Sequence, residues 1–138
     1  MADQKTILVV DDESDIRFTL TKILESENYN VIQAKNGQEA LDIIDDEKNV
    51  ISLIMLDIMM DKVNGYEFIK RLDKIKRKNL YIIMLTAMAT NDNIMKGYVE
   101  GADYYITKPF KSETVTNIVS YLIGDLTDDK KREVELLL

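Results

Sequence analysis

The chain has 138 residues, of which 18 are Lys or Arg and 25 are Asp or Glu, and it contains no His and no Cys. The length predicts about one domain, and the missing His and Cys exclude disulfides, thiolate or imidazole catalysis, and metal sites built from those ligands. The net charge of −7 disfavours binding to nucleic acid or to anionic membranes. Neither a membrane span nor a signal peptide is predicted. We therefore expect a cytoplasmic protein whose chemistry uses carboxylates, hydroxyls, lysines and hard metal ions.

Five short apolar runs, rich in β-branched and aromatic residues, predict five β-strands. Residues 7–10, 51–56 and 80–85 are almost continuously apolar, which is typical of strands covered by helices on both faces. The two remaining runs are residues 29–32 and 104–106.

Between these runs, apolar residues recur every three or four positions, which predicts helices. The stripes cover residues 16–24, 41–44, 66–75 and 115–122. Four side chains are suited to cap helices: Asn36, Asn64, Asn91 and Ser112. Of these, Asn91 would start a further helix outside the four stripes. The alternation of strands and helices predicts an α/β, doubly wound fold, in which right-handed crossovers join parallel strands.

Polar side chains follow four of the five predicted strands. They are Asp11, Asp12 and Glu13 after the first strand, Asp57 after the third, Thr86 after the fourth, and Lys108 and Pro109 after the fifth. Each alone fits a helix start or a loop, but the carboxyl ends of strands in a doubly wound sheet meet in a ligand-binding crevice. Converging carboxylates need a cation, and Mg²⁺ suits carboxylates that also face phosphate oxygens.

The chemistry that fits these residues is phosphoryl transfer. A metal ion, the Lys108 ammonium and the Thr86 hydroxyl would together spread the negative charge of the transferred group. Asp57 is the better candidate nucleophile, because the adjacent Asp11 and Asp12 look like a metal-binding pair. Its attack on phosphorus would give an acyl phosphate.

Four motifs resemble those of two-component response-regulator receiver domains of the CheY-like type: residues 7–13, residues 55–60 with Gly65, residues 85–87, and residues 101–110. The resemblance implies a flavodoxin-like (βα)5 sandwich with strand order 2-1-3-4-5. We expect residues 1–123 to form the receiver domain. Residues 124–138 are expected to be a C-terminal tail or the start of a linker to an output module.

The resemblance implies that Asp57 is the phosphoacceptor and that Lys108 pairs with the phosphoryl group or with Asp57. Asp12, Asp57 and the backbone carbonyl of Met59 would bind Mg²⁺, and Asp11 would act mainly through water. The family often has Pro four residues after the phosphoacceptor, where this chain has Asp61.

The resemblance also implies a switch. Thr86 and Tyr105 match the switch pair, and the Lys108–Pro109 peptide bond would be cis. Phosphorylation would change the surface formed by helix 4, strand 5 and helix 5, through which such domains can form homodimers. The implied partners are a sensor histidine kinase or phosphotransfer protein and a downstream protein or output domain.

Two other functions compete with a phosphorylation-dependent switch. An aspartate-nucleophile Mg²⁺ phosphatase usually has a second Asp two residues after the nucleophile to protonate the leaving group, and here that residue is Met59. A receiver that binds partners without being phosphorylated is the other alternative. We expect a signalling switch that is not an enzyme.

The last fourteen residues follow Gly124, which predicts a helix end. Charged residues there give way to Val134, Leu137 and Leu138 at helical spacing. This apolar end packs either on the domain or on a partner, or continues into a longer chain.

Overall fold

The computed structural model of the chain describes residues 4–58, 65–75, 79–87, 101–124 and 127–137. Its centre is a five-stranded sheet in the order β2-β1-β3-β4-β5. The strands are β1 (Thr6–Val10), β2 (Asn30–Ala34), β3 (Leu53–Asp57), β4 (Tyr81–Thr86) and β5 (Tyr104–Thr107). All neighbouring strands are parallel, which confirms the predicted doubly wound fold and its strand order.

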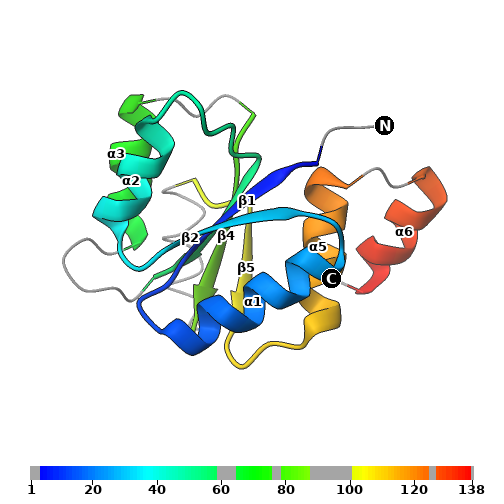
Figure 1. Cartoon of the computed structure of the whole chain (residues 1–138). Helices are drawn as coiled ribbons and strands as arrows, with labels where there is room; N and C mark the ends of the chain where they lie inside the picture. Colours follow the sequence, from blue (N-terminus) through cyan, green and yellow to red (C-terminus); the bar gives the residue numbers. More distant parts are fainter. Residues whose placement is uncertain (1–3, 59–64, 76–78, 88–100, 125–126, 138) are drawn as a thin grey trace.

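Helices cover both faces of the sheet. The described helices are α1 (Ser14–Ser26), α2 (Gly37–Asp45), α3 (Gly65–Ile75), α5 (Ser112–Ile123) and α6 (Asp128–Leu137). Figure 1 shows α2 and α3 on one face, with α1 and α5 on the other. The predicted helix near Asn91 and the predicted cap Asn64 lie outside the described residues. None of the helices in the described ranges combines the length and apolar character needed to cross a membrane.

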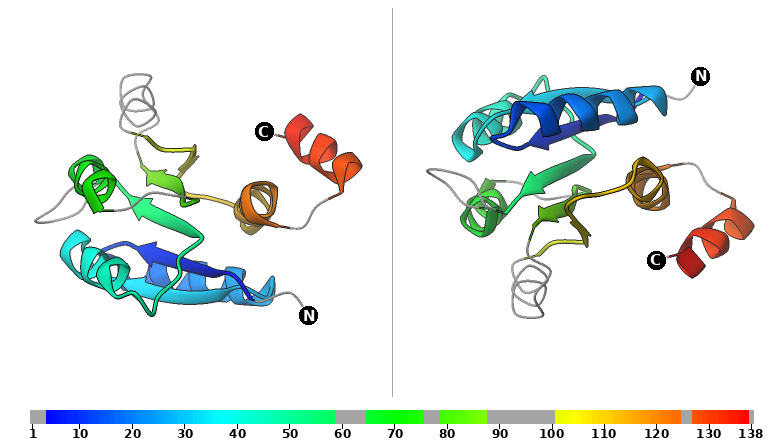
Figure 2. Two further views of the ribbon diagram at one scale, coloured as in Figure 1. Left: turned by 90° about the horizontal axis from the view of Figure 1, so that it is seen from above. Right: turned by 90° about the horizontal axis from the view of Figure 1, so that it is seen from below.

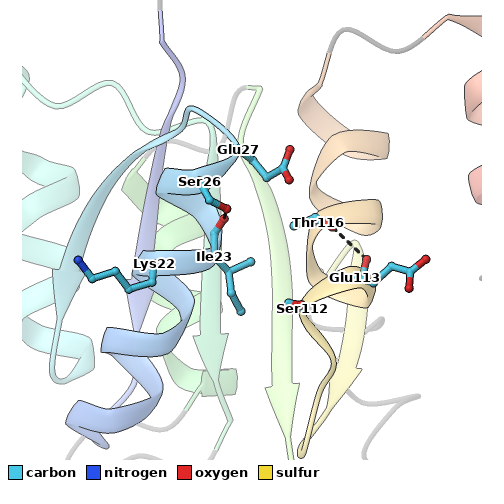
Figure 3. Close-up of a pocket in the computed structure, with 7 residues that line it drawn as sticks. All are labelled: Lys22, Ile23, Ser26, Glu27, Ser112, Glu113 and Thr116. Atoms are coloured by element: carbon cyan, nitrogen blue, oxygen red, sulfur yellow. Dashed lines mark hydrogen bonds between the residues drawn. The ribbon is translucent and has the colours of Figure 1, made fainter.

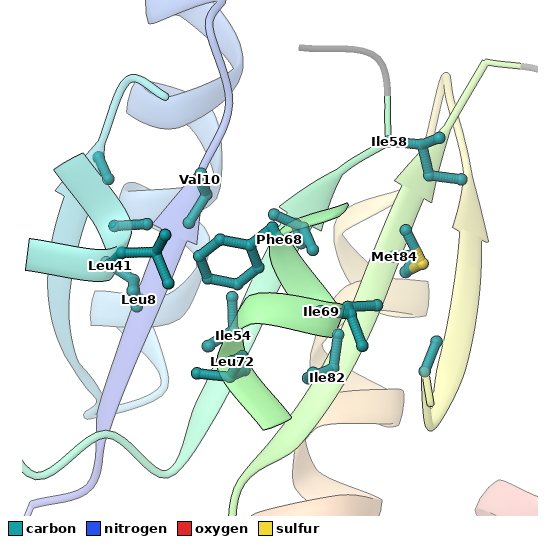
Figure 4. Packing of buried hydrophobic residues seen from close by; sticks show 14 residues of the cluster. Leu8, Val10, Leu41, Ile54, Ile58, Phe68, Ile69, Leu72, Ile82 and Met84 are labelled. Atoms are coloured by element: carbon teal, nitrogen blue, oxygen red, sulfur yellow. The ribbon is translucent and has the colours of Figure 1, made fainter. Parts of the chain in front are cut away.

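Strands buried on both faces explain the continuous apolar runs. Leu8 and Val10 point toward α2 and α3, whereas the intervening Ile7 and Val9 point toward α1 and α5, and all four are fully buried. Figure 4 shows Phe68 of α3 lying over the sheet in the first of these two clusters. Because successive side chains of a strand alternate between faces, each strand supplies both cores.

One of the predicted helix caps is confirmed and one is wrong. The Asn36 side chain accepts a hydrogen bond of 2.8 Å from the backbone N–H of Glu39. Ser112, however, is the first residue of α5 and not its cap. Lys111 holds the cap position in extended conformation, and its carbonyl accepts from the N–H of Val115 at 3.2 Å, so the helical backbone already includes Ser112.

The tail folds into α6 and packs on α5 (Figure 2). Gly124 follows α5, as expected, where a Cβ atom would lie 2.6 Å from the carbonyl oxygen of Ser120. Thr127 directly precedes α6, and its hydroxyl accepts from the N–H of Lys130 at 3.2 Å. Val134 is buried. Leu137, in contrast, is 68% exposed, and Leu138 lies outside the described residues. The tail therefore packs on the domain through Val134, and the options for the rest of its apolar end stay open.

Candidate functional site

The parallel strands bring the predicted polar residues to one edge of the sheet. Asp11 follows β1, Asp57 ends β3, Thr86 ends β4 and Lys108 follows β5. In the register of the sheet, Asp57 lies beside Leu85 and Thr86 lies beside Thr107. The carboxyl ends of β1, β3, β4 and β5 thus form one edge, as the sequence predicted.

Three carboxylates converge at this edge. Asp11, Asp12 and Asp57 each offer an oxygen, and these oxygens all lie within 4.8 Å of one another. Asp11 and Asp57 are buried, whereas Asp12 is exposed. Buried like charges at this distance are unfavourable without a cation. A donor set of carboxylate oxygens with an open, exposed side fits Mg²⁺, which binds few carboxylates and keeps several waters.

Lys108 places its ammonium group among these carboxylates. Its Nζ atom lies 2.9 Å from Oδ2 of Asp11, 3.6 Å from Oδ2 of Asp57 and 4.0 Å from Oε1 of Glu13. The backbone N–H of Lys108 donates to the carbonyl of Thr86 at 2.7 Å, which ties this segment to the end of β4. The Lys108–Pro109 peptide bond is cis, as the resemblance implied.

The charge of Lys108 is stabilised in spite of its burial. Burial by itself lowers the pKa of the ammonium group, but the hydrogen bond to Asp11 and the neighbouring carboxylate charges outweigh it. The pKa is therefore raised above its ordinary value of 10.5, and Lys108 is charged at neutral pH.

The loop after β1 is fixed by bonds to Asp11. The N–H of Asp11 donates to the carbonyl of Ala34 at 3.2 Å, and the Oδ1 atom of Asp11 accepts from the N–H of Glu13 at 2.9 Å. Arg17 of α1 donates from Nη1 to the Asp11 carbonyl at 2.7 Å. Arg17 is not among the site residues predicted from the sequence. Its only signal was a basic residue in a helix that starts beside the acidic pair, and a solvent-exposed helix face gives the same pattern.

Gly65 allows α3 to begin close to the end of β3. Its N–H donates to the carbonyl of Ile58 at 3.0 Å. A Cβ atom on Gly65 would lie 2.9 Å from the Cα of Ile58 and 3.1 Å from the carbonyl oxygen of Asp57. The glycine therefore permits a close approach of two backbone segments beside Asp57.

We expect Gly65→Ala to lower the free energy of unfolding by about 2 kcal/mol, because the added methyl group must displace backbone in a packed site. Urea denaturation measures the change. Arg71→Ala is the control, since it removes an exposed ion pair with Glu67 in the same helix and should cost no more than about 0.5 kcal/mol. Equal losses in the two variants would contradict the close-approach explanation.

Thr86 and Tyr105 lie near each other on neighbouring strands. Thr86 of β4 pairs with Thr107 of β5, and Tyr105 lies two residues before Thr107 on β5. The side chains of Thr86 and Tyr105 therefore project from the same face of the sheet. Thr86 is buried and Tyr105 is partly buried against the α2 and α3 core. The arrangement places the two residues of the expected switch pair as diagonal neighbours.

Two hollows lie away from the acidic cluster. One, of about 410 Å³, runs along β5 and α5, and Tyr105, Phe110, Ile118 and Leu137 are among its lining residues. The other, of about 450 Å³, lies between α1 and α5 (Figure 3). There the hydroxyl groups of Ser26 and Thr116 donate to carbonyl groups of their own helices.

The structure brings together Asp11, Asp12, Asp57 and Lys108, with Thr86 at the same edge. The resemblance implied that Lys108 would pair with Asp57 or with a phosphoryl group, whereas its shortest ion pair is with Asp11. Met59 and Asp61 lie outside the described residues.

Comparisons with known proteins agree on one family. Residues 7–120 match the response regulator receiver domain. Over 134 residues the chain is 39% identical to the phosphate regulon transcriptional regulatory protein PhoB of Pseudomonas aeruginosa, covering 96% of this chain and 58% of PhoB. It is 40% identical over 117 residues to the transcriptional regulatory protein CpxR of Escherichia coli, covering 84% of this chain and 48% of CpxR. The chain thus spans about half the length of these curated relatives.

A solved structure supports the same assignment. The response regulator TrrA of Thermotoga maritima, in complex with Mg²⁺–BeF, is 35% identical and superposes with a TM-score of 0.75. The match covers 87% of this chain and all of TrrA. The motifs, the sheet order and these matches have one explanation. The chain belongs to the response regulator receiver domain family, the phosphorylation-dependent signalling switches of two-component systems.

Proposed function

We propose that Asp57 accepts the phosphoryl group in this receiver domain, in a reaction that requires Mg²⁺. The observation that carries the proposal is the Lys108 ammonium group placed between Asp11 and Asp57, beside a third carboxylate from Asp12. A Mg²⁺ ion held there would withdraw electron density from the phosphoryl oxygens. An oxygen of Asp57 attacks phosphorus, so that the new P–O bond forms while the bond to the donor breaks. The product is an aspartyl phosphate.

The contacts of Asp11 support different metal-binding roles for the aspartates. Both oxygens of Asp11 already accept a hydrogen bond, one from the N–H of Glu13 and one from Lys108. Direct binding of a metal would have to replace one of these bonds, whereas a metal-bound water would only add to them. We therefore assign Asp12 and Asp57 as direct ligands, together with the backbone carbonyl of Met59, and Asp11 as a ligand through water.

Lys108 would change its ion-pair partner when a phosphoryl group is bound to Asp57. In the unmodified site its closest partner is Asp11, but its Nζ atom is only 3.6 Å from an oxygen of Asp57. A phosphoryl group on Asp57 would therefore arrive within reach of the ammonium group. The Thr86 hydroxyl would turn toward the same oxygens, and Tyr105 would then rotate toward the space beside Thr86. Such a change shifts the population between two arrangements of the β5 surface.

The donor and the output are other proteins or domains. These 138 residues contain no His, so a phosphohistidine donor lies outside them, in a histidine kinase or phosphotransfer protein. Because the curated relatives are transcriptional regulators of about twice the length, we assign residues 1–123 to the receiver and residues 124–138 to a tail that leads toward an output. We include a homodimer through the surface of helix 4, strand 5 and helix 5 among the forms that the activated domain can take. We place the protein in the cytoplasm, where histidine kinases present their phosphoryl group.

Aspartyl phosphate formation is tested by intact-mass measurement after incubation with acetyl phosphate or phosphoramidate. We expect one phosphoryl group per chain in the presence of Mg²⁺. In excess EDTA the rate should fall by at least about 100-fold, because the close carboxylates then repel the incoming anion. No mass gain with Mg²⁺, or an equal gain in EDTA, would contradict the proposal.

A further inference from the structure

The helix α6 lies outside the part of the chain that matches the family, which ends at residue 120. Figure 2 shows it beside α5, with its C-terminal end on the side of β5. It therefore lies against α5, and only its C-terminal end, at Leu137, borders the hollow along β5 and α5. It lies beyond the family match, although the similarity to PhoB, over 96% of this chain, extends into it.

Few contacts of α6 with the domain are apolar. Val134 is 2% exposed, whereas Leu136, two residues later, is 88% exposed. The Tyr121 hydroxyl of α5 donates to Oε1 of Glu135 at 2.7 Å. Leu137 lines the 410 Å³ hollow that Tyr105, Phe110 and Ile118 also line. The helix thus contacts the outer side of α5 and forms one wall of the groove beside Tyr105.

The composition of α6 favours reversible attachment. Its first six residues are all charged, and all are exposed apart from Lys131, which is partly exposed. A ten-residue helix in water is too short to be stable by itself. Val134 belongs to neither of the two core clusters of the sheet. Release of α6 would therefore leave the folded domain intact, as a local unfolding event.

We propose that α6 is a displaceable cover of the β5 and α5 surface, and that rearrangement of the groove at Tyr105 releases it. Leu137, itself 68% exposed, and Tyr105 line the same groove, so a rotation of Tyr105 changes the surface that borders the end of α6. The occupant of this surface in the unmodified chain is then its own α6, and a partner that binds here must first displace it. The release of α6 on phosphorylation rests on the proposed function. The packing of α6 on this surface in the unmodified chain does not.

The covering is tested with two matched substitutions in the full chain. Val134→Asp places a charge at the buried position, and Leu136→Asp places the same charge at the exposed position. Hydrogen-exchange mass spectrometry should show amide exchange in residues 128–137 at least about tenfold faster in Val134→Asp than in wild type. Leu136→Asp should exchange like wild type. Equal exchange in all three proteins would overturn the covering.

Titration of Tyr121 gives a second readout of the same contact. The hydrogen bond to Glu135 and the charge of that carboxylate raise the pKa of Tyr121 above its ordinary value of 10.0. In Val134→Asp, the Tyr121 absorbance should titrate at the ordinary value, and in Leu136→Asp at the raised value. Tyr121→Phe, which removes the absorbance, identifies the signal. A raised Tyr121 value that persists in Val134→Asp would show that the contact survives and would overturn the proposal.

The coupling is tested with Mg²⁺ and beryllofluoride, an analogue of the phosphoryl group. Addition to the wild-type chain should accelerate exchange in residues 128–137. By linkage, Val134→Asp should bind beryllofluoride at least about fivefold more tightly than Leu136→Asp. Binding that leaves α6 exchange unchanged would overturn the coupling and leave the phosphoacceptor assignment standing. Absence of binding in every protein would instead overturn the proposed function, and the exchange comparison of the two variants would still decide the covering.

Discussion

Asp57→Asn is expected to remove phosphoryl uptake from acetyl phosphate, with a fall in rate of more than about 100-fold, because the amide oxygen is not a carboxylate nucleophile. Asp57 is buried at the end of β3 and faces the Lys108 ammonium group at 3.6 Å. The substitution nearly preserves side-chain volume, so the backbone at the end of β3 should be retained. The measurement is intact mass over time in Mg²⁺.

Asp15→Asn is the matched control for this change. Asp15 is an exposed carboxylate in the first turn of α1, and its substitution removes the same charge without touching the acidic cluster. The control should gain one phosphoryl group at the wild-type rate. A gain that persists in Asp57→Asn would mean that another carboxylate, such as Asp12, is the acceptor.

Lys108→Met is expected to lower the free energy of unfolding by about 2 kcal/mol at pH 7 without Mg²⁺. The side chain of Asp11 is fully buried and accepts a hydrogen bond from Lys108, and loss of one partner leaves a buried charge uncompensated. The Lys108 side chain is 14% exposed, which keeps the expected loss below that of a fully buried pair. Added Mg²⁺ should restore more stability to this variant than to wild type, because the cation supplies the missing charge.

The pH dependence of this difference follows from the raised pKa of Lys108. A group whose pKa is higher in the folded state stabilises the fold fully below its unfolded value of about 10.5. The stabilisation is lost as the pH rises through the folded pKa. The difference between wild type and Lys108→Met should therefore persist from pH 7 to about pH 10 and shrink above that range.

Urea denaturation at several pH values measures this effect, with Lys111→Met as the control. Lys111 is exposed and caps α5 through its backbone alone, so its replacement should change stability by no more than about 0.5 kcal/mol. Equal stability of Lys108→Met and Lys111→Met would show that the Asp11 ion pair contributes nothing measurable.

Much of this architecture could be predicted because local pattern and global fold agree. β3 is apolar up to its last residue, Asp57, and buried throughout, so its sequence directly indicated a central strand between two helical layers. Asp11, Asp57 and Lys108 were predicted to meet because parallel strands place their carboxyl ends together. Only topology is needed for that prediction, not side-chain geometry.

The features that could not be predicted from the sequence depend on which of several available contacts a side chain makes in the folded protein. The pairing of Lys108 with Asp11 in preference to Asp57 depends on differences of less than an ångström. The role of Arg17 depends on a hydrogen bond to the backbone carbonyl of Asp11. Because every residue has a backbone carbonyl, the sequence does not indicate which one accepts the bond. For α6, the stripe through Val134 predicted an apolar face, but the surface that covers it exists only after α5 has folded.

The charged groups at the carboxyl edge of the sheet also determine the net charge of the site. Among the described residues they are four carboxylates and two cations: Asp11, Asp12, Glu13, Asp57, Arg17 and Lys108. Their formal charges leave two negative units, which one divalent cation would neutralise. An aspartyl phosphate carries about one negative charge more than the carboxylate it replaces, so phosphorylation would leave the neutral site with a single surplus charge. Such a surplus is costly in a buried place, and a turn of the Thr86 hydroxyl toward the phosphoryl oxygens would lower that cost.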